Sequence, residues 1–104
     1  MGYKFNGKRY ITRGIDNTLP VDIQLILFQS IELMRRKVEE LDRLQVMTLD
    51  TIKKDGIKVL HITHEQERPE GKLEYYIPVE SEFKCKVFVI DDVEYVTMLL
   101  AEEY

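Results

Sequence analysis

Cysteine and long apolar runs are both scarce in this sequence, and each shortage excludes a class of protein. Cys85 is the only cysteine among 104 residues, so the chain can form neither an internal disulfide nor a thiolate zinc site. The longest apolar runs, such as 25–28 and 87–90, contain four residues, whereas a membrane-spanning helix needs roughly 20. Residues 1–13 contain no apolar stretch of signal-peptide length. We therefore expect a cytoplasmic protein.

A strong basic excess is missing as well. Lysine and arginine total 15 against 19 aspartate and glutamate residues, which gives a formal net charge of -4. This balance is unlike that of proteins that bind nucleic acid without sequence specificity. Hydrophobic residues make up 44% of the chain, and its length suits one core. The sequence predicts a single domain over residues 1–104.

A helical pattern begins at Pro20, after the turn-forming residues 16–18. Apolar residues then recur at the spacing of one face of an α-helix. These residues are Ile23, Leu27, Ile31, Met34, Val38 and Leu41. Val21, Leu25 and Phe28 widen the apolar surface at the start of the helix. We predict that this end is either deeply buried or covered by a partner, which makes these three residues a candidate protein interface.

Strand patterns occupy most of the remaining chain. Strands are predicted over 9–15 before the helix and, after it, over 44–49, 57–63, 73–77, 83–90 and 94–100. The pair Asp55-Gly56 is typical of a hairpin turn, and residues 95–103 fit either a strand or a short helix. The order β-α-β-β-β-β-β predicts an α+β fold. We expect one long amphipathic helix packed on a mostly antiparallel sheet of about five or six strands.

Motifs at both ends of the chain are similar to those of a known family. They are Tyr10-Ile11-Thr12-Arg13-Gly14, the helix start 20–24, 88–92 with Tyr95, and 97–104. Together they resemble an uncharacterised bacterial family, the domain-of-unknown-function family 960, over nearly the whole chain. The resemblance implies a small cytoplasmic accessory protein of low-GC Gram-positive bacteria and of their prophages or mobile elements. It implies no activity.

The only histidines, His61 and His64, are followed closely by Glu65 and Glu67. Such side chains bind zinc or manganese, which makes a metal-dependent hydrolase one hypothesis. On a regular strand, however, residues three apart point to opposite faces, so both imidazoles reach one metal only if a bulge or strand end intervenes. We therefore predict no metal site, with His61 half-buried on a strand and His64 in a loop.

Motifs of catalysis are missing from the sequence. It contains neither a glycine-rich phosphate loop nor a nucleophile elbow. Asp91 and Asp92 fit a turn better than a general acid and base pair. We expect no cofactor and no catalytic residue, and we favour a protein that is not an enzyme.

The leading hypothesis is a noncatalytic protein-interaction or accessory module. It would form a homodimer or bind another bacterial or phage protein, through the wide apolar helix start or a sheet edge. The alternative is a nucleic-acid-associated protein in which the basic N-terminal edge, Lys8, Arg9 and Arg13, contacts phosphates. Metal-dependent hydrolysis through His61 and His64 is the third hypothesis.

Overall fold

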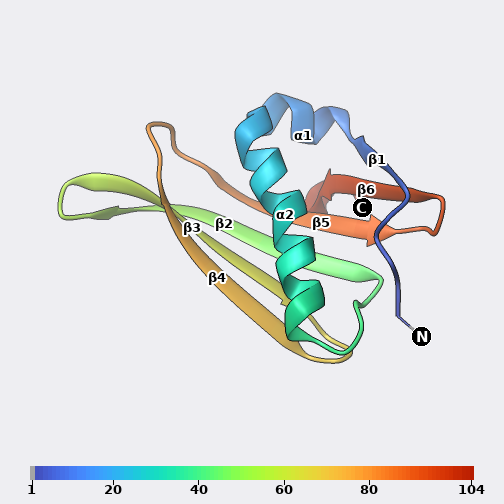
Figure 1. Cartoon of the computed structure of the whole chain (residues 1–104). Helices are drawn as coiled ribbons and strands as arrows, with labels where there is room; N and C mark the ends of the chain where they lie inside the picture. Colours follow the sequence, from blue (N-terminus) through green and yellow to red (C-terminus); the bar gives the residue numbers. More distant parts are fainter. Residues whose placement is uncertain (1) are drawn as a thin grey trace.

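The computed structural model describes residues 2–104 of the chain. Its elements are β1 (Lys8–Ile11), α1 (Arg13–Thr18), α2 (Val21–Lys37), β2 (Leu44–Lys54), β3 (Ile57–Gln66), β4 (Gly71–Pro78), β5 (Lys84–Asp91), β6 (Tyr95–Leu100) and the 3-10 turn η1 (Ala101–Glu103). The strands form one sheet of order β1-β6-β5-β2-β3-β4, and α2 lies across one face of it (Figure 1). Neighbouring strands are antiparallel, except that β1 and β6 run parallel. The predicted α+β fold is confirmed.

A short helix replaces part of the predicted first strand. The prediction of a strand over 9–15 is wrong in its second half, because Arg13–Thr18 forms α1. The Thr12 hydroxyl caps this helix by accepting a hydrogen bond from the Ile15 backbone N–H at 3.3 Å. The carboxylate of Glu103, from the other end of the chain, lies at the same helix start. The order of elements therefore begins β-α-α instead of β-α.

Helix α2 begins after Pro20, as predicted, but it ends at Lys37 and not at Leu41. Val38 already has extended backbone angles. Leu41 is buried beyond the helix, where it pairs with Tyr3 in an isolated β-bridge. The apolar spacing outlasts the helix because the segment that follows buries its apolar residues in the same core.

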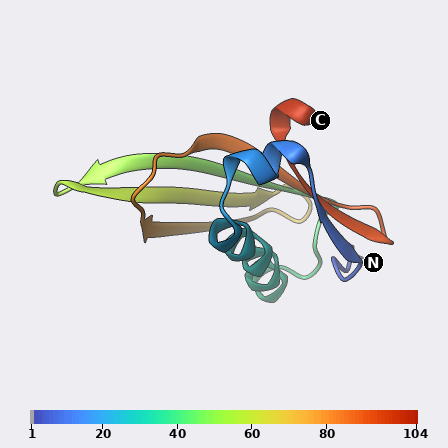
Figure 2. The same ribbon diagram turned by 90° about the horizontal axis from the view of Figure 1, so that it is seen from above.

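The core lies between α2 and the sheet. Its side chains come from one face of α2 and from alternate positions of the central strands. They include Ile23, Leu27, Ile31 and Met34 of α2, and Met47, Leu49, Leu60, Ile62, Val87, Val89, Val96 and Met98 of the strands. The turn η1 lies on the other side of the sheet from α2 (Figure 2). There Tyr104 meets the ring of Phe88 edge-on, with the centroids 5.6 Å apart.

Two predictions about the strand connections can be compared with the structure. Asp55 and Gly56 have φ values of 54° and 80°, as a tight hairpin between β2 and β3 requires, so this turn is confirmed. The last segment combines both readings that the sequence left open. Residues 95–100 form β6, and residues 101–103 form the turn η1.

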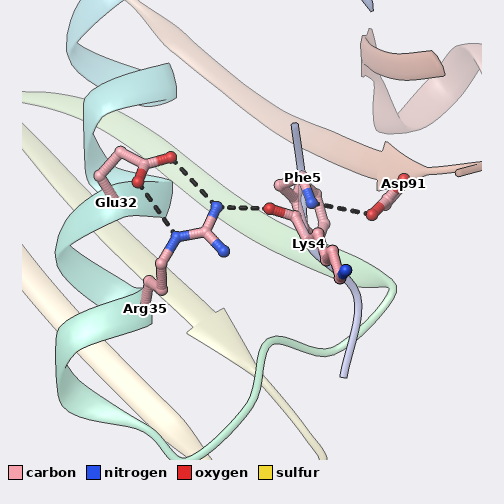
Figure 3. Close-up of polar contacts among 5 residues, drawn as sticks. All are labelled: Lys4, Phe5, Glu32, Arg35 and Asp91. Atoms are coloured by element: carbon pink, nitrogen blue, oxygen red, sulfur yellow. Dashed lines mark hydrogen bonds and ion pairs between the residues drawn. The ribbon is translucent and has the colours of Figure 1, made fainter. Parts of the chain in front are cut away.

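The segment before β1 is fastened to both α2 and β5 (Figure 3). Arg35 binds both carboxylate oxygens of Glu32, and its Nη2 also donates to the Lys4 carbonyl at 2.5 Å. The Phe5 N–H donates to Asp91 Oδ2 at 2.9 Å, and the Phe5 ring is buried in the core. Asp91 is 3% exposed, and its Oδ1 accepts from the Val93 N–H at 2.7 Å, so its carboxylate both holds the segment before β1 and supports the predicted turn.

Glu103 joins the two ends of the chain. Its Oε1 accepts hydrogen bonds from the Thr12 hydroxyl at 2.6 Å and the Leu100 N–H at 2.8 Å, while Oε2 accepts one from the Gly14 N–H at 3.2 Å. These bonds, that of Thr12 first, lower the pKa of the Glu103 carboxyl. A β-carbon on residue 14 would lie 2.5 Å from the carboxyl carbon, so a larger residue there would displace the Glu103 carboxylate from the position it has in the structure.

Replacing Glu103 with glutamine is expected to lower the Tm at pH 7, because charge-assisted hydrogen bonds are lost. The folded-state pKa lies below the ordinary value of 4.5. The carboxylate's contribution is therefore complete above pH 4.5 and is lost as the pH falls through the folded-state pKa. Thermal melts of the wild type and Glu103→Gln should differ at pH 7 and approach each other as the pH falls below the folded-state pKa.

The control for this comparison is Glu102→Gln, which removes the same charge from the exposed neighbouring residue. It should melt like the wild type at both pH values. If the difference for Glu103→Gln is as large at low pH as at pH 7, the carboxylate is not the source of the stabilisation.

Candidate functional site

An apolar cleft lies where α2 begins, beside the end of β4 and the connection from β4 to β5. Its volume is about 530 Å3, within the usual range for binding pockets. Most of its lining is apolar: Pro20, Ile23, Ile26, Ile57, Ile77, Pro78, Val79 and Phe83. Phe83 is fixed by Thr51, whose backbone N–H donates to the Phe83 carbonyl at 2.9 Å and whose hydroxyl accepts from the Phe83 N–H at 2.7 Å. The connection thus forms one wall of the cleft.

The sequence singled out Val21, Leu25 and Phe28 as an interface, and the structure separates them. Val21 and Leu25 are 65% and 53% exposed, on the same two turns of α2 that line the cleft. Phe28 is only 6% exposed, and the Arg9 guanidinium lies 4.6 Å from the centre of its ring. The intramolecular cation–π contact covers Phe28, so only the first two residues are available to a partner.

Acidic side chains border the cleft. Asp22 and Glu80 both line it, and both are exposed. The neighbouring Glu82 is paired with Lys58 at 3.6 Å. An apolar surface with a negative rim favours apolar ligands that carry a positive charge beside the apolar part.

The predicted phosphate contacts do not gather on one surface. Arg9 and Lys8 are adjacent on β1, so their side chains leave opposite faces of the strand, and Arg9 lies over the ring of Phe28. Arg13 is the first residue of α1. All three are exposed, but their arrangement differs from the continuous groove that tracks a nucleic-acid backbone.

The two histidines point to opposite faces of β3, as their spacing predicts. His61 stacks on Tyr76 with ring centroids 4.6 Å apart, and its Nε2 is 2.8 Å from Glu74 Oε2. The hydrogen bond from His61 is the main cause of a lowered pKa of Glu74. His64 is 0% exposed, and it lies within β3, so its prediction as a loop residue is wrong. Among residues 2–104, His, Cys, Asp and Glu side chains form no group suited to a metal ion.

His64 belongs to a chain of buried polar side chains that sequence reasoning missed. Its Nδ1 is 2.6 Å from Ser30 Oγ, and its Nε2 is 2.7 Å from Gln45 Oε1. Ser30 Oγ is also 2.9 Å from the Tyr75 hydroxyl. Gln45 Nε2 donates to Gln66 Oε1 at 2.7 Å. These hydrogen-bonded side chains thus link α2 to three neighbouring strands.

The side-chain amides of Gln45 and Gln66 determine the direction of every hydrogen bond in this network. Gln66 Nε2 donates to two backbone carbonyls, so its Oε1 accepts from Gln45, and Gln45 Oε1 must accept from His64 Nε2–H. His64 Nδ1 is then unprotonated and accepts from the Ser30 hydroxyl, which in turn accepts from Tyr75. Burial lowers the pKa of His64 to about 4, which favours this neutral form.

This serine and histidine pair is enclosed in the core. Ser30 is 1% exposed and His64 is 0% exposed, so neither side chain is accessible to solvent. In the described residues every buried side-chain nitrogen and oxygen has a hydrogen-bond partner. The sequence contained one signal for the network, because Leu60, Ile62 and His64 alternate on the buried face of β3.

A second hollow, of about 850 Å3, lies on the sheet face opposite α2. Its floor includes Leu44, Val46 and Phe88. The rim carries cations and carboxylates: Arg43, Arg68 and Lys86, and Asp42, Glu65, Glu67 and Glu70. Because the rim carries charges of both signs, it does not favour a ligand of either charge.

Cys85 is half-buried in β5 on the face towards α2, where it packs against the core. Burial raises the pKa of its thiol, and Glu102 adds to the effect. The thiol is therefore protonated at neutral pH, as suits a structural residue.

Comparison with protein families identifies this architecture. Residues 8–103 match the family described as staphylococcal protein of unknown function, DUF960. The chain belongs to this family. A crystal structure of a protein of unknown function from Enterococcus faecalis has the same fold as this family member, with a TM-score of 0.65 and 23% sequence identity over 97% of this chain and 93% of the other. No curated protein matches the sequence. Within residues 2–104, no helix has both the length and the apolar character needed to cross a bilayer.

Proposed function

We propose that this protein is a noncatalytic adaptor of the bacterial cytoplasm that binds another protein in the cleft at the start of α2. The observation that carries the proposal is the apolar lining of a cleft that stays open while the core beside it is complete. An open apolar cleft of this kind is a common feature of binding surfaces in soluble proteins.

The exposed side chains around the cleft support a protein partner of defined chemistry. Ile57, which lines it, is 58% exposed, and Val21 and Leu25 lie on the adjoining turns of α2. Asp22 and Glu80 add negative charge at the rim. The partner segment is an apolar stretch followed or preceded by lysine or arginine, from a protein of the bacterium or of a phage.

The competing hypotheses gain no support from the arrangement of their residues. A hydrolase would need His61 and His64 at one site, and they lie on opposite sheet faces. Nucleic-acid binding would need Lys8, Arg9 and Arg13 on one surface, and Arg9 is engaged with Phe28. Neither objection applies to the apolar cleft, because its lining residues already lie together.

A photo-crosslinking amino acid at position 57 tests the proposal in a bacterial host. The expected result is a discrete adduct with one host or phage protein that survives nuclease treatment. With that partner purified, Ile57→Asp is expected to weaken binding at least about tenfold, because a charge enters an apolar contact. Binding can be measured by calorimetry.

The matched control is Val93→Asp, which places the same charge at a residue that is 73% exposed in the turn between β5 and β6. It should bind the partner like the wild type. Two outcomes would contradict the proposal that this cleft binds the partner protein. One is an adduct that disappears with nuclease, and the other is equal binding by Ile57→Asp and the wild type.

A further inference from the structure

Strand β4 forms one edge of the sheet, and its outward hydrogen-bonding groups can be assigned. The Val79 N–H donates to the Lys58 carbonyl at 3.1 Å, so these opposed residues form a hydrogen-bonded pair. Such pairs alternate along an antiparallel ladder. It follows that Lys72, Glu74 and Tyr76, together with Pro78, direct their backbone groups away from β3.

Two of these outward groups are already accounted for. The Lys72 carbonyl accepts a hydrogen bond from Lys37 Nζ of α2 at 2.7 Å. Pro78, at the other end of the edge, has no N–H. The remaining groups are the carbonyls of Glu74, Tyr76 and Pro78 and the N–H groups of Lys72, Glu74 and Tyr76.

We infer that this edge pairs antiparallel with the β4 strand of a second copy of the chain, about a two-fold axis at Tyr75. In this register Glu74 opposes Tyr76 of the second copy, so each donates to and accepts from the other. Lys72 opposes Pro78 of the second copy. The Lys72 N–H meets the proline carbonyl, while the missing proline N–H faces the Lys72 carbonyl that Lys37 already satisfies. Every outward group is paired.

Registers shifted by two residues lose this complementarity. In one direction the Tyr76 N–H of the second copy competes with Lys37 for the Lys72 carbonyl. In the other direction the Glu74 carbonyl faces Pro78, which has no donor. The edge is therefore complementary to itself in one register, which favours a closed dimer over an open fibre.

Side chains on the two sheet faces are compatible with the same register. On the face towards α2, the half-buried Tyr75 meets its symmetry mate, and Leu73 opposes Ile77 of the second copy. On the other face the two Glu74 carboxylates are diagonal neighbours. Each is drawn towards its own β3 by His61 Nε2 at 2.8 Å, which reduces their repulsion.

The register is tested by disulfide trapping in a Cys85→Ser background. Residues facing each other across a non-hydrogen-bonded antiparallel pair have Cα atoms about 4.5 Å apart, which permits a disulfide. Tyr75→Cys should therefore give a covalent dimer on oxidation. Leu73→Cys should not, because Leu73 faces its symmetry mate only in a register shifted by four residues. Equal trapping of both, or trapping of neither, would overturn the assignment.

A second test separates the backbone pairing from the side chain. Tyr76→Pro removes an outward N–H but no hydrogen bond to β3, whereas Tyr76→Ala removes the same ring and keeps the N–H. In sedimentation experiments the wild type and the alanine variant should be dimers, and proline should raise the dissociation constant at least about tenfold. A monomeric wild type at high concentration would sink the proposal. Ile77 and Pro78 of β4 also line the cleft, but Tyr76 does not and Ile57 lies in β3, so the variants at positions 76 and 57 test the dimer and the cleft separately.

Discussion

His64→Leu is expected to lower the free energy of unfolding by about 3 kcal/mol. Leucine fills a similar volume, but it removes the Nδ1 that accepts from the Ser30 hydroxyl and leaves Gln45 Oε1 without a donor. Both groups are at most 1% exposed, so water does not replace the lost partner. Each buried polar group left unsatisfied costs about 1 to 3 kcal/mol. Urea denaturation measured at pH 7 gives the difference.

The same strand supplies the control. His61→Leu makes an identical chemical change three residues away, on the face where the side chain is partly exposed. It is expected to change the free energy of unfolding by no more than about 1 kcal/mol, because solvent can replace the bond to Glu74. If the two variants are equally destabilised, the buried network is not what makes His64 important.

Stability is expected to fall by about 3 kcal/mol as the pH drops from 6.5 to 4, through His64 alone. Burial lowers the folded-state pKa to about 4, whereas the unfolded chain has the ordinary value of 6.5. The neutral imidazole's contribution is therefore complete above pH 6.5. It is lost progressively towards pH 4, because the unfolded chain binds the proton more readily.

Carboxylates also titrate near the lower end of this pH range. The effect of His64 is therefore measured as the difference in stability between the wild type and a variant that lacks the histidine. Unfolding free energies of the wild type and His64→Gln should be compared at intervals between pH 7 and pH 4. The wild-type curve should be steeper, and the ring-proton NMR signal of His64 should titrate with a midpoint near 4. Parallel stability curves, or a midpoint near 6.5, would contradict the neutral network.

The fold class could be predicted because it rests on local periodicity. The stripe from Ile23 to Met34 identified α2, and the β-branched and apolar residues of 57–63 beside the Asp55-Gly56 turn identified β3. Helix α1 was missed because its start is stabilised by Glu103, which is 89 residues from Gly14 along the chain. Periodicity within a short window contains no information about such a partner.

The candidate site was predicted only in part, for a related reason. The exposure of Val21 and Leu25 was one of two outcomes that the helix pattern allowed. The cleft needs Phe83 and Val79, which reach α2 only because β4 and β5 are separated in the sheet by β3 and β2. Strand order is not encoded in the spacing of residues along one chain, so neither the cleft nor the β4 edge could be located.

The parallel pairing of β1 with β6 has a consequence for the protein's synthesis. Lys8 pairs opposite Tyr95, so the first strand leaves the ribosome long before its partner has been made. At about 5 to 20 residues per second, β1 waits roughly 4 to 20 seconds. Glu103, which caps α1, emerges later still. The sheet therefore cannot be completed until β6 has been made, and the pairing of β1 is expected to be a late folding step.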